Sequence, residues 1–329
     1  MIQNDNILSV RDLSVDFGTA YGVVEALRNV SFDVPPGSII GIVGESGCGK
    51  STLINAILGL LPSNGHIRNG QLLFKGLGDL RKKNATEMTS IRGVDISVVF
   101  QDPMNALNPV RTIGQQMRDI QYRLQASSRQ KDKRSVAMLQ KVRMPDAESR
   151  LRQYPHEFSG GMKQRIAIAM ALLLEPQLLI ADEPTTALDA TLELATIEML
   201  RDIQSEMNCA ILFISHHLGV ISELCEQVII MYAGEVVEKG HVSAVFDDPR
   251  HPYTRMLLEC DPAWEDDISL RLNTIAGEIP DLRNRPHGCI FASRCDLVIS
   301  DCLIGKPPVI RPAPGRVARC RFADEGDRL

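Results

Sequence analysis

One glycine-rich segment constrains the fold more than any other feature of this chain. Residues 44–51 read Gly-Glu-Ser-Gly-Cys-Gly-Lys-Ser and fit the pattern G-x-x-x-x-G-K-[ST]. The apolar run 39–43 precedes this segment, and a helix-forming run, 52–60, follows it. Strand, loop and helix therefore occur in the order that a phosphate-binding loop requires, and we predict an α/β fold.

The residue types in this loop suit a nucleoside triphosphate. Glycines let backbone N–H groups turn toward phosphates, and the N-terminus of the following helix adds partial positive charge. Lys50 is expected to pair with the β- and γ-phosphates, and the Ser51 hydroxyl to ligate Mg²⁺. Cys48 is interpreted as a small filler residue, with a redox role as the alternative. The residues of this segment predicted to bind ATP are Gly44, Glu45, Ser46, Gly47, Cys48, Gly49, Lys50, Ser51 and Thr52.

Two carboxylates follow a second apolar run, Leu178–Ala181. A strand there would place Asp182 and Glu183 at the carboxyl edge of the sheet, beside the phosphate loop. Asp182 then suits Mg²⁺, directly or through water, and Glu183 suits a general base that polarises the attacking water. The alternative is a solvated carboxylate pair at a strand end.

The rest of the chain alternates strand-like and helix-like stretches, as a largely parallel sheet requires. Residues 104–174 contain helical stretches without a convincing strand, so we predict a helical subdomain there. After Ala233-Gly234, which is expected to form a hairpin turn, Asp247-Asp248-Pro249 breaks the pattern. We therefore expect a domain over residues 1–246 and an irregular extension over 247–329. The remaining predicted strands are 7–17, 70–74, 94–100, 210–215 and 227–231, and the helices are 134–142, 160–174, 190–207 and 218–224.

The segment Phe158-Ser159-Gly160-Gly161-Met162 opens the helical stretch that runs to Leu174. Here the sequence resembles the ABC ATPase superfamily, whose signature usually reads L-S-G-G-Q, and the form with Met162 resembles that of peptide importers. Ser159 and the backbone N–H groups of Gly160 and Gly161 would make a second phosphate cradle at a helix start. In this family the signature acts on ATP bound to a partner subunit. Without the resemblance, Ser159 could be only a helix cap.

The other landmarks of the superfamily appear in order over roughly residues 7–246. Gln101 resembles the glutamine that senses Mg²⁺ and the attacking water, and is predicted with Glu183 and His216 to be catalytic. His216 resembles the switch histidine that holds the γ-phosphate. The resemblance makes Ser51, Gln101 and Asp182 the expected Mg²⁺ ligands.

Three further positions are assigned less directly. Asp189, in Thr186-Ala187-Leu188-Asp189, resembles the D-loop that contacts the opposite subunit. His217 stands where the family usually has Asp, which leaves the fine tuning of the switch open. Phe17 is expected to stack on adenine, with Tyr21 as the rival.

Four of the eight cysteines crowd residues 289–320, with five, six and 17 residues between them. Four thiolates can enclose a [4Fe–4S] cluster or a zinc ion. The C-x₂₋₄-C pairs common at zinc sites are absent. The tail around His251-Pro252-Tyr253-Thr254 and Arg294-Cys295 resembles that of the oligopeptide and dipeptide importers, which favours the cluster, while unligated thiols remain a third possibility. The expected ligands are Cys289, Cys295, Cys302 and Cys320.

The resemblance implies an ATPase subunit of a di- or oligopeptide importer. Its expected partners are a second nucleotide-binding subunit, identical or related, two transmembrane permease subunits, and indirectly an external substrate-binding protein. The segment 101–109 resembles the loop that docks on the membrane subunits. Two alternatives stay open: an importer of nickel or another small solute, and a soluble ABC ATPase that acts on ribosomes or DNA.

Charge and hydropathy narrow the location and the partners. The net charge is −5 and the pI is near 5.9, so no excess of basic residues suggests nucleic acid as a partner. Residues 1–6 lack the features of a secretory signal. The longest apolar run, 166–174, is far shorter than the roughly 20 residues needed to cross a bilayer. We expect a peripheral protein at the cytoplasmic face of the inner or plasma membrane.

Overall fold

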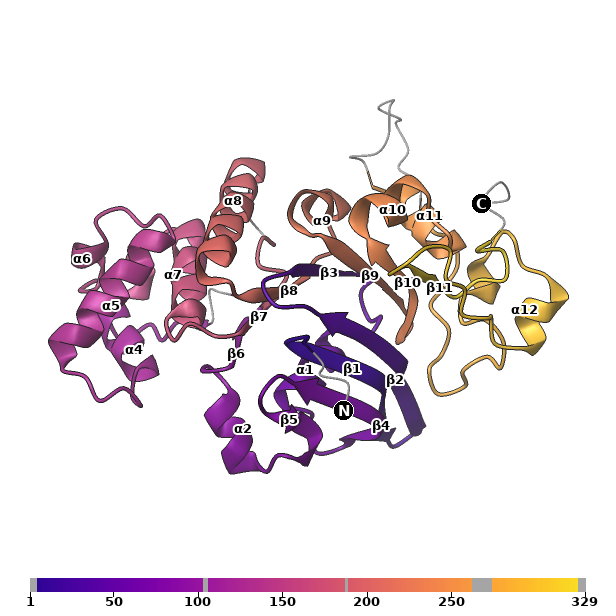
Figure 1. The fold of residues 1–329 in the computed structure, drawn as a ribbon, viewed down its shortest axis with the longest axis horizontal. Coiled ribbons are helices and arrows are strands. Elements are labelled where there is room, and N and C mark those ends of the chain that lie inside the picture. The colour runs from indigo at the N-terminus through magenta and orange to yellow at the C-terminus, as the bar shows by residue number, and fades with distance from the viewer. Residues whose placement is uncertain (1–4, 103–105, 187–188, 262–273, 325–329) are drawn as a thin grey trace. The chain divides into compact units, whose positions relative to one another are not determined.

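The computed structural model describes residues 5–102, 106–186, 189–261 and 274–324. They form two compact units. Unit 1 contains the residues up to Val34, Ile39–Lys82, and the residues from Ser215 onward. Unit 2 contains Pro35–Ser38 and Lys83–Ile214. Both units combine strands with helices, and the predicted α/β fold is confirmed (Figure 1).

One sheet of unit 1 is antiparallel, with the strand order β2-β1-β4-β5. Its bounds are β1 Leu8–Thr19, β2 Gly22–Val34, β4 Gly65–Phe74 and β5 Gly78–Asp79. The pairing of β1 with β2 is irregular near its middle, where Asp12 and Asn29 have positive φ angles of 46° and 49°. Short polar residues tolerate that conformation better than β-branched ones do, so they suit the irregular positions.

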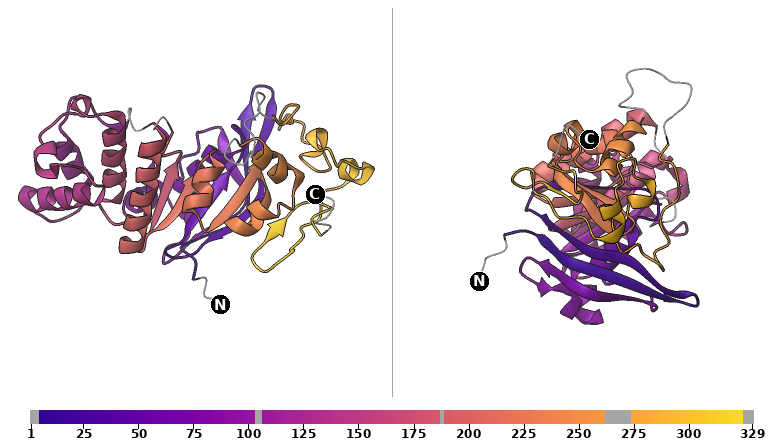
Figure 2. Two further views of the ribbon diagram at one scale, coloured as in Figure 1. Left: turned by 90° about the horizontal axis from the view of Figure 1, so that it is seen from above. Right: turned by 90° about the vertical axis from the view of Figure 1, so that its right-hand side faces the viewer.

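The other strands of unit 1 carry the phosphate loop. β3 (Ile39–Val43) is buried along its whole length and runs parallel to β9 (Gln227–Tyr232). β10 (Glu235–His241) pairs antiparallel with β9 through the predicted Ala233-Gly234 turn, whose two residues both have positive φ, as a tight hairpin requires. β11 (Val317–Ala318) extends this set. Figure 2 shows the antiparallel sheet that contains β1 and β2 as a separate layer, and β2 contacts β10.

Short helices and an irregular segment complete unit 1. The segment from residue 274 contains little regular structure, and its short strand, β11, pairs antiparallel with β10 (Figure 1). Most of its path is therefore fixed by side-chain contacts. The helical elements are α1 Lys50–Leu58, η1 Leu80–Lys82, α9 Leu218–Leu224, α10 Val242–Asp247, α11 Pro252–Glu259, η4 Ala292–Arg294 and α12 Ser300–Ile304.

Unit 2 holds three parallel strands in the order β8-β7-β6. Their bounds are β6 Ile96–Val99, β7 Leu178–Asp182 and β8 Ala210–Ile214. α5 packs against α4, α6 and α7 (Figure 1). The helical elements are α2 Ala85–Ile91, α4 Ile113–Ile120, α5 Ser128–Lys141, α6 Ala147–Arg150, η2 Pro155–Glu157, α7 Gly160–Leu172 and α8 Ala190–Met207. Within the described ranges, no helix is long and apolar enough to span a bilayer.

Candidate functional site

The glycine-rich loop joins β3 to α1 in unit 1, as predicted. Gly49 caps α1 with φ 105°, a conformation that side-chain-bearing residues rarely adopt. A Cβ at Gly44 would lie 2.1 Å from the carbonyl oxygen of Met231 on β9. Glycine is thus required at both ends of the loop: at Gly49 for its backbone conformation, and at Gly44 because a side chain would clash with β9.

Lys50 folds back over this loop. Its side-chain ammonium donates to the carbonyl oxygens of Gly44 and Glu45, at 2.5 and 3.2 Å, and the residue is only 9% exposed. In the part of the chain that the structure describes, no carboxylate pairs with it. A buried cation without an anion is unfavourable, so the loop is suited to receive an anionic group such as a phosphate.

Cys48 lies inside the same loop and is fully buried. Its Sγ is 3.6 Å from the Lys50 ammonium, yet burial outweighs that charge and raises the pKa of the thiol. A protonated, inaccessible thiol is a poor nucleophile. This supports the interpretation of Cys48 as a filler.

The predicted histidine follows β8 and lies in unit 1. The N–H of the preceding residue, Ser215, donates to the carbonyl oxygen of Ile42 at 3.2 Å, so this segment leaves the sheet where β3 leads into the loop. The rings of His216 and His217 meet edge to face at 4.7 Å, and both residues are exposed. His216 is therefore available to a ligand at this sheet edge.

The two candidates for adenine stacking differ in their surroundings. Tyr21 is 85% exposed. Phe17, on β1, is half-buried, and its ring lies so close to Gly65 that a Cβ there would be 2.6 Å from Cε1. The fixed ring of Phe17 is the better stacking surface, because less side-chain freedom is lost when a base binds.

In unit 2 the predicted carboxylates lie at the end of β7. Asp182 is its last residue, and Glu183 follows with φ 47°. The Gln101 side-chain amide donates to Glu183 Oε2 at 2.8 Å, and the Thr186 hydroxyl lies 3.2 Å from the same oxygen. The structure thus brings Gln101 and Glu183 together. Left-handed backbone at a non-glycine residue costs about 1–3 kcal/mol.

The signature residues lie at the start of α7. Ser159 is its N-cap, accepting a hydrogen bond from the Met162 N–H at 3.4 Å. Ser159 and Gly160 are exposed, Gly161 is half-buried, and the space around the Gly160 Cα is open. The helix start is accessible to a ligand, as a phosphate cradle requires.

Two predicted loops lie partly outside the described residues. Asp189 caps α8, accepting from the Leu192 N–H at 2.9 Å, whereas Ala187 and Leu188 are not described. Residues 103–105 of the segment after Gln101 are likewise outside the described ranges. For these positions the sequence interpretation stays a prediction.

The expected iron–sulfur site is contradicted. Across the described residues, no group of three or more His, Cys, Asp or Glu side chains is arranged to hold a metal ion, which overturns both the [4Fe–4S] cluster and the zinc alternative. Burial raises the pKa of Cys289 to about 12 and that of Cys320 to about 11. The four cysteines, Cys289, Cys295, Cys302 and Cys320, line one cavity. Its volume is only about 20 Å³.

His251 lines the same cavity and leads to a pH-dependent prediction. It is 1% exposed, and its Nδ1 accepts the Tyr253 N–H at 3.1 Å. Burial lowers its pKa from 6.5 to about 3, so the folded state keeps it neutral while the unfolded chain takes up a proton below pH 6.5. Its contribution to stability is complete above that pH and is lost between pH 6.5 and about 3.

As the pH falls below 6.5, we expect protonation of His251 in the unfolded chain to lower the free energy of unfolding by up to about 1.4 kcal/mol for each pH unit. Urea unfolding at several pH values from 7.5 to 5.0, on the wild type and on His251→Gln, measures the difference. The two slopes should differ between pH 6 and 5. Equal slopes would contradict the prediction.

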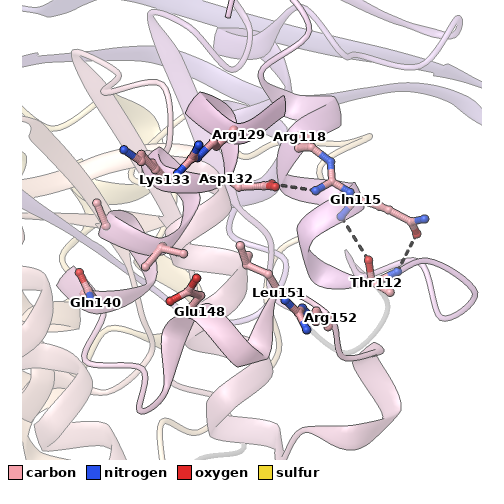
Figure 3. Close-up of a pocket in the computed structure, with 12 residues that line it drawn as sticks. Thr112, Gln115, Arg118, Arg129, Asp132, Lys133, Gln140, Glu148, Leu151 and Arg152 are labelled. Carbon is pink, nitrogen blue, oxygen red and sulfur yellow. Dashed lines mark hydrogen bonds and ion pairs between the residues drawn. The ribbon is translucent and has the colours of Figure 1, made fainter. Parts of the chain in front are cut away.

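A separate cavity of about 680 Å³ lies in unit 2 among α4, α5 and α6 (Figure 3). Arg118 donates to Asp132 at 2.7 Å, and Thr112 and Gln115 exchange two hydrogen bonds at its rim. None of the residues predicted from sequence to bind ATP or to act in catalysis lines it. Size alone therefore does not identify the functional site.

Sequence reasoning assigned no role in the site to two residues that contact the phosphate loop. Arg294 pairs with the Glu45 carboxylate at 2.7 Å, and the Tyr253 hydroxyl accepts the Glu45 N–H at 3.0 Å. Both lie more than 200 positions along the chain from Glu45. No local pattern could have indicated these contacts.

Comparison with protein-family models gives two matches. Residues 27–186 match the ABC transporter family, and residues 237–302 match the oligopeptide/dipeptide transporter C-terminal region. Among curated proteins, the oligopeptide transport ATP-binding protein OppD of Bacillus subtilis (strain 168) is 43% identical over 94% of this chain and 87% of its own length. The dipeptide transport ATP-binding protein DppD of the same strain is 46% identical over 88% and 87%.

Solved structures of the same kind are similar in fold. The dimeric structure of MJ0796, a bacterial ABC transporter cassette, gives a TM-score of 0.63 at 26% identity, covering 71% of this chain and 98% of that one. The structure of cbiO1 from Clostridium perfringens, part of the ABC transporter complex cbiONQ, gives 0.65 at 27% identity, with 74% and 92% covered.

Proposed function

This chain belongs to the family of ABC transporter ATP-binding proteins of the oligopeptide/dipeptide type, and we propose that it hydrolyses ATP to drive peptide import through a membrane transporter. The observation that carries the ATP site is the buried Lys50 ammonium, which donates only to loop carbonyls and a thiol among the described residues. That arrangement supplies a cation and a glycine-rich backbone for a triphosphate.

The residues of unit 1 are proposed to bind the nucleotide. Lys50 would move from the Gly44 and Glu45 carbonyl oxygens to the β- and γ-phosphates, and Phe17 would stack on adenine. His216 would hold the γ-phosphate through its exposed ring. The backbone N–H groups at the start of α1 would contribute the rest of the phosphate contacts.

The residues of unit 2 are proposed to carry the chemistry. Glu183 would polarise the attacking water, with its carboxylate oriented by the Gln101 amide. Ser159, Gly160, Gly161 and Met162 would cover the ATP of a partner subunit, and Asp189 would contact that subunit. An intact Glu183 and His216 argue against a subunit that binds ATP without hydrolysing it.

Magnesium is proposed as the resident metal of the ATP site. Hard oxygen donors suit Mg²⁺, and Ser51, Gln101 and Asp182 supply a hydroxyl, an amide and a carboxylate. When bound, the ion neutralises charge that develops on the phosphates. Ser51 is exposed and Asp182 half-buried, so neither donor is enclosed in the core.

The assembly and the division of the chain are also proposals. We propose a dimer of nucleotide-binding subunits, identical or related, docked on two permease subunits at the cytoplasmic face of the membrane, with an external binding protein that delivers peptide. We retain residues 1–246 as the nucleotide-binding domain, with a helical subdomain over about 104–174, and 247–329 as an importer-type extension. The peptide relatives, OppD and DppD, support the substrate class.

Uptake measurements test the proposal. A strain of the source organism lacking this chain should lose uptake of a labelled tripeptide, and expression of the wild-type chain should restore it. A Glu183→Gln chain should not restore it, whereas Glu206→Gln, an exposed surface substitution on α8, should. Loss of nickel uptake with intact peptide uptake would support the small-solute alternative. Normal uptake of both, with ATPase activity stimulated by RNA or ribosomes, would support the soluble alternative.

A further inference from the structure

The phosphate loop is attached to the C-terminal segment through one of its own residues, Glu45. Arg294, in η4, forms a bidentate ion pair with the Glu45 carboxylate. Its Nη1 lies 2.7 Å from Oε2, and its Nη2 lies 3.0 Å from Oε1. The Arg294 side chain is 4% exposed and that of Glu45 27%. Bidentate pairs of this kind fix orientation as well as distance.

The surroundings of Arg294 leave its guanidinium no freedom. Besides Glu45, its nitrogens donate to the carbonyl oxygens of Ile275 and Ala276, at 2.8 and 2.9 Å, and to the Tyr232 hydroxyl at 3.3 Å. These contacts use all five N–H donors that an arginine side chain possesses. Arg294 is therefore a rigid fixture, and the loop carboxylate is its only charged partner among the described residues.

A second contact fixes the backbone of the same loop residue. The Glu45 N–H donates to the hydroxyl of Tyr253, on α11, at 3.0 Å. Tyr253 is fully buried, and its ring packs against Tyr232 and Phe291 with centroids 4.7 and 5.4 Å apart. Both the side chain and the N–H of Glu45 are thus occupied, while its carbonyl oxygen accepts from Lys50.

Other ion pairs also attach the C-terminal segment to the rest of unit 1. Arg285 pairs with Glu235 at 2.9 Å and donates to the Ala233 carbonyl oxygen, and Arg316 pairs with the buried Glu238 at 3.0 Å. These pairs attach the segment to β10 and the preceding turn. The contact of Arg294 with Glu45 is therefore additional to docking, and it acts on the loop.

We propose that Arg294, together with Tyr253, is a positioning residue that holds the phosphate loop in its nucleotide-binding conformation through Glu45. The proposal rests on the ATP site proposed above. A loop held in its bound shape loses less conformational entropy when a ligand binds, so affinity is higher. Glu45 itself then acts as the anchor of the loop rather than as a phosphate contact.

The test compares Arg294→Gln with the purified full-length wild type in steady-state ATP hydrolysis. We expect the KM for Mg-ATP to rise about tenfold while kcat changes less than about threefold, because the lost preorganisation concerns binding. Hydrogen–deuterium exchange of the nucleotide-free protein should be faster at residues 44–51. Glu45→Gln should have the same effects, and adding it to Arg294→Gln should change little more, as expected for two partners of one contact.

Arg316→Gln is the matched control, since it also removes a buried arginine from a carboxylate in unit 1 but one that lies on β10. It should lower stability without raising the KM or the exchange of the loop. If Arg294→Gln does not fold, Glu45→Gln provides the same readouts from the other side of the contact. An unchanged KM and unchanged loop exchange would overturn the inference, whereas a wild type that neither binds nor hydrolyses ATP would instead overturn the proposed function.

Discussion

Replacing Lys50 by methionine is expected to reduce ATP hydrolysis at least about 100-fold, the loss typical when a preorganised charge partner of a reacting group is removed. The fold should not suffer. Lys50 is a buried cation that lacks a carboxylate partner in the described structure, and methionine fills similar space without a charge to desolvate. Thermal unfolding without nucleotide should therefore occur at the wild-type temperature or above it.

The same variant should lose the stabilisation that ATP gives the wild type. A ligand that binds only the folded state raises the free energy of unfolding by RT ln(1 + [L]/Kd). If the site is weakened, ATP should therefore no longer raise the unfolding temperature. Lys82→Met, at an exposed lysine of unit 1, serves as the control and should keep both activity and shift. A marked loss of stability in Lys50→Met would mean that the lysine is a structural residue.

The second large effect is expected for Glu183→Gln, which should lower kcat by about 10²–10⁴-fold while ATP still binds. Glutamine keeps the shape of the side chain and can still accept the Gln101 hydrogen bond, but it cannot take a proton from water. The measurements are single-turnover hydrolysis and equilibrium nucleotide binding on the same preparation.

Glu206→Gln, exposed on α8 of unit 2, controls for the loss of a carboxylate. If Glu183→Gln hydrolyses ATP at the wild-type rate, Glu183 is not the base. If it fails to bind ATP, its effect is on the loop conformation that φ 47° imposes, and the kinetic result carries no information on proton transfer.

The parts of the fold that could be predicted from sequence are those governed by local patterns. β3 and α1 follow from an apolar run, a glycine-rich loop and a helix-forming run, and the Ala233-Gly234 hairpin follows from its turn residues. α8 and α9 begin and end at the predicted residues, Ala190–Met207 and Leu218–Leu224. In each case the local preference agrees with the tertiary structure.

Elements with irregular patterns were missed or shortened. β2 was not predicted, because its alternation of buried and exposed residues breaks near Asn29, where the pairing with β1 shifts. α5 begins at Ser128, six residues before the predicted start at 134, since its first turns are polar and are stabilised by a capping box between Ser127 and Gln130. Apolar periodicity cannot detect turns that lie in solvent.

In the candidate site, too, local motifs predicted some residues, whereas contacts between distant segments could not be predicted. Local motifs located Lys50, Glu183 and Gln101, and the structure places the last two in contact. The cysteine spacing suggested a metal site that the described geometry does not support, because spacing along the chain does not show how the thiols are arranged in space. The contact of Arg294 with Glu45 depends on packing between distant segments, which no motif contains.

The attachment of the loop to Arg294 also has a consequence for synthesis. Arg294 lies 249 positions after Glu45, and at roughly 5–20 residues per second the ribosome needs about 12–50 s to reach it. During that interval the phosphate loop of the nascent chain lacks its contact with Arg294, and it should bind ATP weakly. High affinity for nucleotide would therefore be acquired late in translation, after the core strands that carry the loop have been made.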